Sequence, residues 1–492
     1  MSGVNGESAA DLLRTPEAGG RVVRGGLVRG IGYAISTVVG LATAMLLLRY
    51  LGVEQFGAYA TVTAILGIVA GVTDAGLTAV ASRELSVARG LEERERLLSN
   101  LLALRIGAAA LGALGAVLFV FVAGYGRELV LGTAIGGVGV VLMSAQSMLT
   151  VPIWVELRIV SLTAIETLRN VFTLVFVAVL VAAGATLLSF LAIQILVAVL
   201  LIPVTFRAAR LGARLTVGVR RDVMGWLVRE TIPLAVAFAM SVIYFRVLVV
   251  LVSLISSEYE TGLFGTSFRI FEVLLGAPAL VLSVALPLLS VAGDEDEERL
   301  RYGLQRMTEV ALLAAALLAV GIGILAEPGI RLIGGPEYEG AVPVLRIQAL
   351  ALIPLFLTMT WQLGLIAGRA QRAMATANGL ALVVVIVLGL ALIPAAGATG
   401  AAWAAVAAES ALATFLLLAL HRARPGATPR LWFAWKVALA AGLAVGAGIV
   451  FRDSPVIGAV AATAVYVTAA LLTRAVPADV FHAFGLHRWR DH

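Results

Sequence analysis

RYLGVEQFGAYATVTAILGIVAGVTDAGLTAVASRELS, residues 49–86, carries the pattern from which the fold of this chain is predicted. A short polar turn is followed by an apolar run that is long enough to cross a bilayer as a helix. Asp74 lies inside that run, and Arg83 and Glu84 follow it closely. This order predicts a membrane hairpin that holds charged side chains at defined depths.

The composition of the whole chain extends this prediction. Of its 492 residues, 61% are hydrophobic and only 13% are charged, whereas a soluble domain keeps about a quarter of its residues charged. The chain is therefore expected to be an all-α, polytopic integral membrane protein. It has no cysteine and only four histidines, so we expect neither a metal site nor a bound cofactor.

Apolar runs of helical length recur along the chain, and each must be helical because lipid cannot satisfy an exposed backbone group. We expect about fourteen membrane spans, near residues 27–48, 56–79, 99–123, 128–151, 162–183, 185–206, 231–255, 262–290, 307–326, 341–367, 374–394, 397–420, 431–451 and 455–474.

The basic residues predict the orientation of these spans. Twenty-eight of the 36 fall in connections on the side of the N-terminus, and only five fall in the opposite turns. Cytoplasmic loops carry the excess of arginine and lysine, so both termini are expected in the cytoplasm. Because the net charge of +6 comes with cations gathered in these loops, it does not indicate a nucleic-acid partner.

The connections divide the chain into parts. The basic, amphipathic segment 207–230 is expected to lie on the inner leaflet and to join two lobes. Both lobes enter their second span through a similar pattern, with Gly57 and Tyr59 in the first and Gly262 and Phe264 in the second. The expected organisation is a tail (1–26), an N-lobe of six spans (27–206), the linker (207–230), a C-lobe of six spans (231–421), two further spans (422–475) and a second tail (476–492).

Four stretches in this order resemble a known family. They are residues 49–84, the segment YFRVLVVLVSLISSEYETGLFGTSFRIFEVL (244–274), the segment IRLIGGPEYEGAVPVLRIQAL (330–350) and the segment LIPAAGATGAAWAAVAAE (392–409). Together they are similar to the polysaccharide-biosynthesis, or lipid-linked oligosaccharide, flippases. That family belongs to the superfamily that also holds the multidrug-extruding and lipid II flippases.

The resemblance implies two pseudo-symmetric six-helix lobes around a central cavity, with two appended helices. It also implies a flippase of the bacterial cytoplasmic membrane that carries undecaprenyl-pyrophosphate-linked glycan from the inner to the outer leaflet. The implied partners are this lipid-linked oligosaccharide, membrane lipids and, on the pathway, a glycan polymerase or glycosyltransferases. At the position of Leu248 many relatives carry an acid, so a cation site built on that carboxylate is not expected here.

Two arginines inside spans are the first candidates for function, because a charge within the membrane is costly unless it faces a cavity or a partner. Arg246 and Arg269 fall at similar depths on their spans. Two guanidinium groups facing one cavity would suit a pyrophosphate headgroup. The alternative is that Arg269 pairs with Glu272 one turn away, and that Arg246 snorkels toward the interface.

A second group of charges lies near the ends of the first two spans. Asp74, Arg29 and Arg83 are expected on the inner side, as a gate or as an entry site for the headgroup, and Arg49 mirrors them on the outer side. The structural alternatives are an Asp74–Arg29 or Asp74–Arg83 ion pair, with Arg49 as an interfacial anchor.

One further acid lies deep in the twelfth expected span. Glu409 has no obvious partner nearby in the sequence. A buried, protonatable glutamate is a candidate for proton coupling. The alternative is a neutral glutamate that is held by a hydrogen bond.

Other functions remain open from the sequence. A drug or cation antiporter would place acids in its cavity, whereas the excess charge in the seventh and eighth expected spans is positive. A membrane glycosyltransferase or polymerase needs a domain or long loop to hold its substrate, and the expected outer loops are short. A channel would need a filter-like repeated loop. We therefore expect a transporter and not an enzyme.

Overall fold

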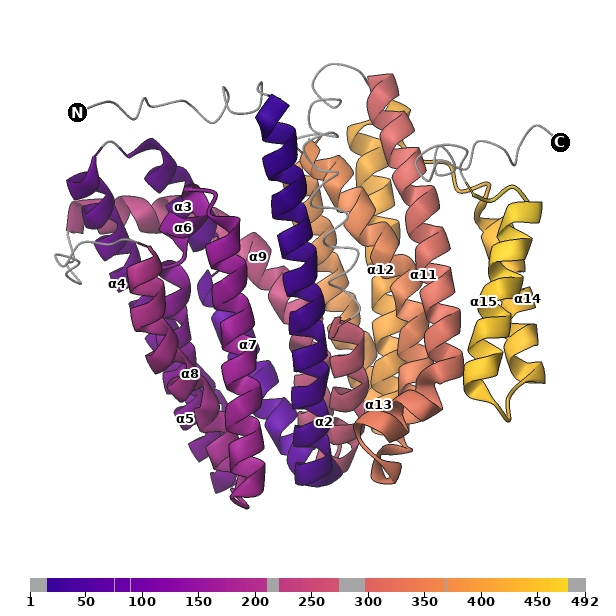
Figure 1. Cartoon of the computed structure of the whole chain (residues 1–492), viewed down its shortest axis with the longest axis horizontal. Coiled ribbons are helices and arrows are strands. Elements are labelled where there is room, and N and C mark those ends of the chain that lie inside the picture. Colours follow the sequence, from indigo (N-terminus) through magenta and orange to yellow (C-terminus); the bar gives the residue numbers. More distant parts are fainter. Residues whose placement is uncertain are drawn as a thin grey trace. The chain divides into compact units, whose positions relative to one another are not determined.

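The computed structural model of the chain describes residues 16–74, 76–88, 90–209, 221–273, 297–367 and 370–476. Within these residues the regular elements are helices and no strand occurs (Figure 1). Ten of the described helices are long and apolar enough to cross a membrane, and the helix Ala434–Val450 is apolar but shorter. The expectation of an all-α, multi-pass membrane protein is confirmed.

The chain divides into two compact units. The first comprises Met1–Leu47 and Val69–Phe238, and the second comprises Leu48–Ile68 and Ala239–His492. The long helices α2 (Pro16–Asp74) and α9 (Arg221–Ile255) contribute to both units.

The other helices of the first unit are α3 (Leu77–Val87), α4 (Leu91–Val122), α5 (Arg127–Met148), α6 (Val151–Val155), α7 (Ile159–Ala182) and α8 (Leu187–Ala208). Helix α5 packs against α4 and α8 (Figure 1). A buried hydrogen bond of 2.8 Å from the Gln146 amide to the Thr205 hydroxyl joins α5 to α8. Because lipid offers no hydrogen-bonding partner, this bond between two membrane helices satisfies both polar side chains.

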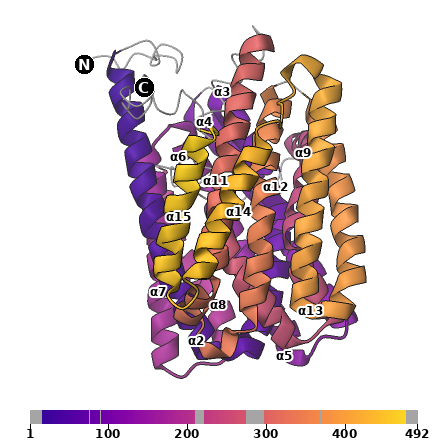
Figure 2. The same ribbon diagram turned by 90° about the vertical axis from the view of Figure 1, so that its right-hand side faces the viewer.

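The second unit holds a helix over residues 258–273, then α11 (Glu297–Ile333), η1 (Pro336–Tyr338), α12 (Ala341–Ala367), α13 (Gln371–Ala423), η2 (Pro425–Ala427), α14 (Ala434–Val450) and α15 (Pro455–Leu472). Helices α14 and α15 lie side by side and contact α11 (Figure 2). The Tyr466 hydroxyl donates a 2.8 Å hydrogen bond to the Leu313 carbonyl, which fastens α15 to α11.

Two of the helices are interrupted by glycines. Helix α2 has 59 residues, which at about 1.5 Å per residue is nearly three times the ~30 Å hydrocarbon core. Gly52, with φ 71°, and Gly397, with φ 53°, divide α2 and α13 into two helical segments each. Glycine suits both breaks because a positive φ carries no Cβ penalty there. The number of spans stays a prediction, since part of the expected span 262–290 lies outside the described residues. Residues 210–220 of the linker and most of both tails also lie outside them.

The two glycines that the sequence pattern pairs lie against each other. A methyl group on Gly57 would overlap the Glu258 carbonyl oxygen and would come 2.9 Å from the Gly262 nitrogen. Reciprocally, a methyl group on Gly262 would overlap the Val53 carbonyl oxygen. Small residues allow helix backbones to approach this closely. The second segment of α2 and the 258–273 helix therefore cross at matching positions of the expected repeat.

Candidate functional site

The candidate site of the second unit begins with an ion cluster between α9 and the 258–273 helix. Arg246 Nη2 lies 2.9 Å from Glu272 Oε1, and Arg269 Nη1 lies 3.2 Å from Glu272 Oε2. The contact between Arg269 and Glu272 follows from their spacing of three residues on one helix. The contact with Arg246 joins two helices, through residues that are 26 positions apart in the chain.

The cluster carries more positive than negative charge. Two guanidinium groups share one carboxylate, so its formal net charge is +1. The side chains of Arg269 and Arg246 are 49% and 29% exposed, against 19% for Glu272. The carboxylate thus fixes the two cations in place while both keep accessible N–H donors. Fixed guanidinium groups of this kind suit phosphate oxygens.

A glycine on α2 makes room for Arg246. A methyl group at Gly67 would come 2.8 Å from Arg246 Nε and 3.0 Å from its Cδ and Cζ atoms. The guanidinium group therefore lies against the bare backbone of α2. A side chain at this position would push Arg246 away from Glu272.

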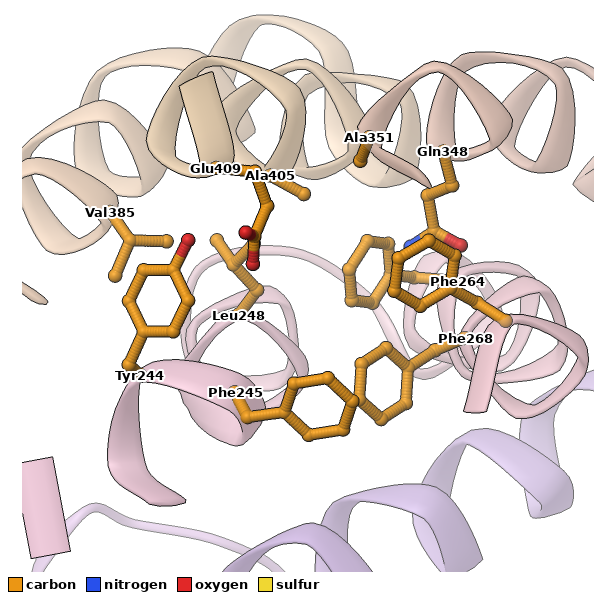
Figure 3. A pocket seen from close by; sticks show the side chains of 11 residues that line it. Tyr244, Phe245, Leu248, Phe264, Phe268, Gln348, Ala351, Val385, Ala405 and Glu409 are labelled. Carbon is orange, nitrogen blue, oxygen red and sulfur yellow. The ribbon is translucent and has the colours of Figure 1, made fainter. Parts of the chain in front are cut away.

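A pocket lies beside the cluster in the same unit (Figure 3). Its walls are mostly aromatic and aliphatic, and its polar groups come from three helices: Tyr244 on α9, Gln348 on α12 and Glu409 on α13. About 30 Å³ is open to the centre of a water molecule, which is more than the ~10–15 Å³ that one water needs. The pocket includes Leu248, the position at which many relatives are expected to carry an acid.

Three consecutive residues of α9 connect the pocket to the ion cluster. Tyr244 hydrogen-bonds Glu409, and its hydroxyl and the carboxyl point toward one another in Figure 3. The Phe245 ring lies 5.1 Å from the Phe268 ring, and Arg246 binds Glu272. A displacement of this part of α9 would therefore change all three contacts together.

The structure gives Glu409 a polar neighbour, Tyr244, that the sequence around Glu409 does not indicate. Glu409 is 6% exposed, and its Oε2 atom has no hydrogen-bond partner. Among the described titratable groups, Tyr244 is the one that interacts with its carboxyl group. Tyr244 was not predicted as a site residue, although it directly precedes the Phe245–Arg246 pair in one of the family-like stretches.

The expected ion pairs of Asp74 are wrong. Its partner is Arg105 on α4, with 2.6 Å between Arg105 Nη1 and Asp74 Oδ1, and the Thr78 hydroxyl donates a 2.5 Å hydrogen bond to the same oxygen. Arg83 instead pairs with its neighbour Glu84 at 2.9 Å. Arg105 was missed because 31 positions separate it from Asp74, and no local spacing rule covers that distance.

Arg29 also lies apart from Asp74. Its Cζ atom is 5.6 Å from the centre of the Trp154 ring, within the range of a cation–π contact. The residue is exposed. The structure therefore does not unite Arg29, Asp74 and Arg83 in one ion cluster.

Arg49 has a structural contact at the Gly52 break. Its Nη2 atom donates a 2.7 Å hydrogen bond to the Leu332 carbonyl in the last turn of α11. A cation is favoured there because the last carbonyls of a helix lack intrahelical donors. Nearby, the Tyr338 hydroxyl donates to the Leu48 carbonyl at 3.0 Å, and burial raises the pKa of Tyr338.

Comparison with protein families identifies the chain. Residues 46–343 match the sequence profile of the family described as polysaccharide biosynthesis protein. The chain belongs to this family. Among curated protein sequences no match is found.

Solved structures share the fold of this family member. The lipid II flippase MurJ in an inward closed conformation matches with a TM-score of 0.77 at 16% identity, over 91% of this chain and 99% of that chain. An inward-facing multidrug resistance MATE transporter of the MOP superfamily matches with a TM-score of 0.64 at 13% identity, over 82% and 98%. A MOP superfamily transporter from Pyrococcus furiosus matches with a TM-score of 0.56 at 15% identity, over 86% and 99%. The expected fold of the superfamily is confirmed.

Proposed function

We propose that this family member is a flippase that moves an undecaprenyl-pyrophosphate-linked oligosaccharide from the inner to the outer leaflet of the bacterial cytoplasmic membrane. Two lobes would alternate in access around a cavity, with both termini in the cytoplasm. The polysaccharide-biosynthesis family supports the glycan pathway, in which glycosyltransferases or a polymerase would be partners. The likeness to flippase and transporter structures supports movement across the membrane without covalent chemistry.

The observation that carries the substrate class is the cluster of Arg246, Glu272 and Arg269. A pyrophosphate needs several donors and a fixed positive charge. The cluster offers two guanidinium groups that are held by one carboxylate and leave one positive charge uncompensated. A cationic drug would instead meet a repulsive surface there.

In the proposed cycle, the headgroup binds to the exposed donors of Arg269 and competes with Glu272 for Arg246. The glycan crosses through the protein while the lipid tail stays in the bilayer. Because the headgroup is held by charge and hydrogen bonds alone, the step requires no catalytic residue. In the first unit, the exposed Arg29 is a further proposed contact of the headgroup.

The test uses cells that lack the protein and are complemented with wild-type or variant genes. We expect Arg246→Ala combined with Arg269→Ala to trap undecaprenyl-linked sugar on the inner leaflet and to abolish display of the surface glycan. Arg331→Ala is the matched control, because it removes an exposed arginine of α11 that pairs with Glu327 and Glu339, outside the cluster. Membrane expression of each variant is measured in parallel.

Two results would overturn the proposal. One is normal release of lipid-linked sugar in cells that express the double arginine variant. The other is a deletion strain that accumulates no such lipid but loses resistance to cationic drugs. The second result would favour a cation antiporter, in agreement with the fold shared with multidrug transporters.

A further inference from the structure

The carboxyl group of Glu409 is buried inside the second unit and is not used by the proposed headgroup site. It projects from α13 into the pocket shared with α9, α12 and the 258–273 helix (Figure 3). Its Oε2 atom is buried without a hydrogen-bond partner. Buried polar atoms are rarely left in this state, so this atom needs a chemical explanation.

The charged groups on the surrounding helices do not neutralise Glu409. On α9, Arg246 is bound to Glu272. On the 258–273 helix, Arg269 is bound to the same carboxylate. On α12, Arg346 donates a hydrogen bond to the Gly323 carbonyl.

The remaining polar groups around the pocket are uncharged. Gln348 accepts a 2.5 Å hydrogen bond from the Ser267 hydroxyl at the other end of the pocket. Tyr244 is the one titratable neighbour that acts on Glu409 among the described residues. A tyrosine hydroxyl donates a hydrogen bond but supplies no positive charge.

Electrostatics then favours one charge state. An isolated carboxylate in a low-dielectric interior costs several kcal/mol, and such a group takes up a proton instead of remaining ionised. The cavity is large enough for a water molecule beside the carboxyl group. The Tyr244 hydroxyl serves the carboxyl group as a hydrogen-bond donor.

We propose that Glu409 is a proton-binding site of the transport cycle, resting on the flippase function proposed above. Its carboxyl group carries a proton in this conformation and releases it when the pocket opens to water, because hydration removes the cost of a buried carboxylate. The link to the substrate is α9, on which Tyr244 and Arg246 are separated only by Phe245. An anionic headgroup that draws Arg246 from Glu272 shifts this segment and opens the pocket around Glu409 to water.

The first experiment measures protonation directly and does not require transport. The full-length protein in lipid nanodiscs is titrated with pH, and the infrared carbonyl stretch of protonated carboxylic acids is recorded. Glu409→Gln is expected to remove a band equivalent to one carboxyl group. Tyr244→Phe is expected to shift this band without removing it, because the hydrogen-bond donor is lost and the acid remains.

Glu309→Gln is the matched control for this experiment. Glu309 is also buried, at 8% exposed, but Arg306 lies 2.8 Å from its Oε2 atom. Because this carboxylate pairs with Arg306, its replacement should leave the protonated band unchanged. A band that persists at full strength in Glu409→Gln would overturn the proposal. If Glu409→Gln does not fold, a shift of the band in Tyr244→Phe supports a protonated acid next to Tyr244, and an unshifted band contradicts it.

The second experiment couples the site to transport. Proteoliposomes receive undecaprenyl-pyrophosphoryl-N-acetylglucosamine, and its flipping is measured with and without an imposed pH gradient. The wild type is expected to respond to the gradient, Glu409→Asp to respond weakly and Glu409→Gln to show no response.

The outcomes separate the two proposals. A gradient response that is retained in Glu409→Gln contradicts the proton site. If the wild type does not move the probe lipid at all, the flippase proposal fails for this lipid, and the infrared band still decides whether Glu409 binds a proton.

Discussion

Glu272 and Glu409 belong to the same compact unit and contact the same stretch of α9, yet they have opposite surroundings. Glu272 binds two arginines at 2.9 and 3.2 Å. Glu409 meets only a tyrosine hydroxyl and keeps one oxygen without a partner. The charge of an acid in a membrane helix therefore depends on the neighbouring helices and not on its depth alone. One acid fixes two cations, while the other is suited to hold a proton.

The largest expected effect separates the two acids by replacing each carboxyl group with an amide. Glu272→Gln leaves two guanidinium groups without their shared carboxylate. It should lower the free energy of unfolding by about 2–3 kcal/mol, less than the ~3–5 kcal/mol of a fully buried pair because both arginines are partly exposed. Glu409→Gln should change it by less than about 1 kcal/mol, since an amide replaces a neutral acid. Thermal and denaturant unfolding in nanodiscs measure the change in the free energy of unfolding for each variant. Equal losses would contradict the difference between the two acids.

A smaller effect should follow when Arg246 is displaced without any change of charge. Gly67→Ala places a methyl group 2.8 Å from Arg246 Nε, which forces the flexible guanidinium group away from Glu272. We expect a loss of about 1–2 kcal/mol, the scale of modest overpacking, together with weaker headgroup binding.

Gly107→Ala is the control for this glycine substitution. It adds a methyl group to a helical glycine of α4 whose surroundings are open, and it should be neutral or stabilising by up to about 1 kcal/mol. Equal losses in the two glycine variants would show that the Arg246 contact is not responsible.

The hydroxyl group that faces Glu409 should contribute about as much as one hydrogen bond. Tyr244→Phe is expected to lower the free energy of unfolding by about 1 kcal/mol. Tyr259→Phe, which alters a tyrosine that is 41% exposed, should have a negligible effect. A loss of several kcal/mol in Tyr244→Phe would mean that Tyr244 compensates a carboxylate and not a protonated acid.

The smallest effect concerns the more exposed cation of the cluster. Arg269→Gln should cost only about 0.2–1 kcal/mol, because its side chain is 49% exposed and the pair is screened by solvent. Raising the ionic strength should reduce the difference further, whereas the protonation of Glu409 should not respond to salt. A cost for Arg269→Gln as large as that for Glu272→Gln would contradict the surplus of positive charge in the cluster.

Some features of the site could be predicted because they depend on local spacing. Arg269 and Glu272 are three residues apart on one helix, so their contact follows from helical geometry. The matching glycines at positions 57 and 262 were visible as a repeated pattern, and the structure brings their backbones together. Leu248 was visible as a departure from the family pattern and lines the pocket beside Glu409.

The membrane class, the helical elements and the family could be read from the sequence, because apolar length and local motifs are properties of the chain. The partners of the charged side chains became visible only in the tertiary structure. Asp74 meets Arg105 rather than Arg29 or Arg83, and Arg246 reaches Glu272 across two helices. Glu409 becomes a buried acid with one tyrosine neighbour only when four helices close around it. The physical reason is that ionisation and pairing depend on distances and burial in space, which the order of residues along one helix does not specify.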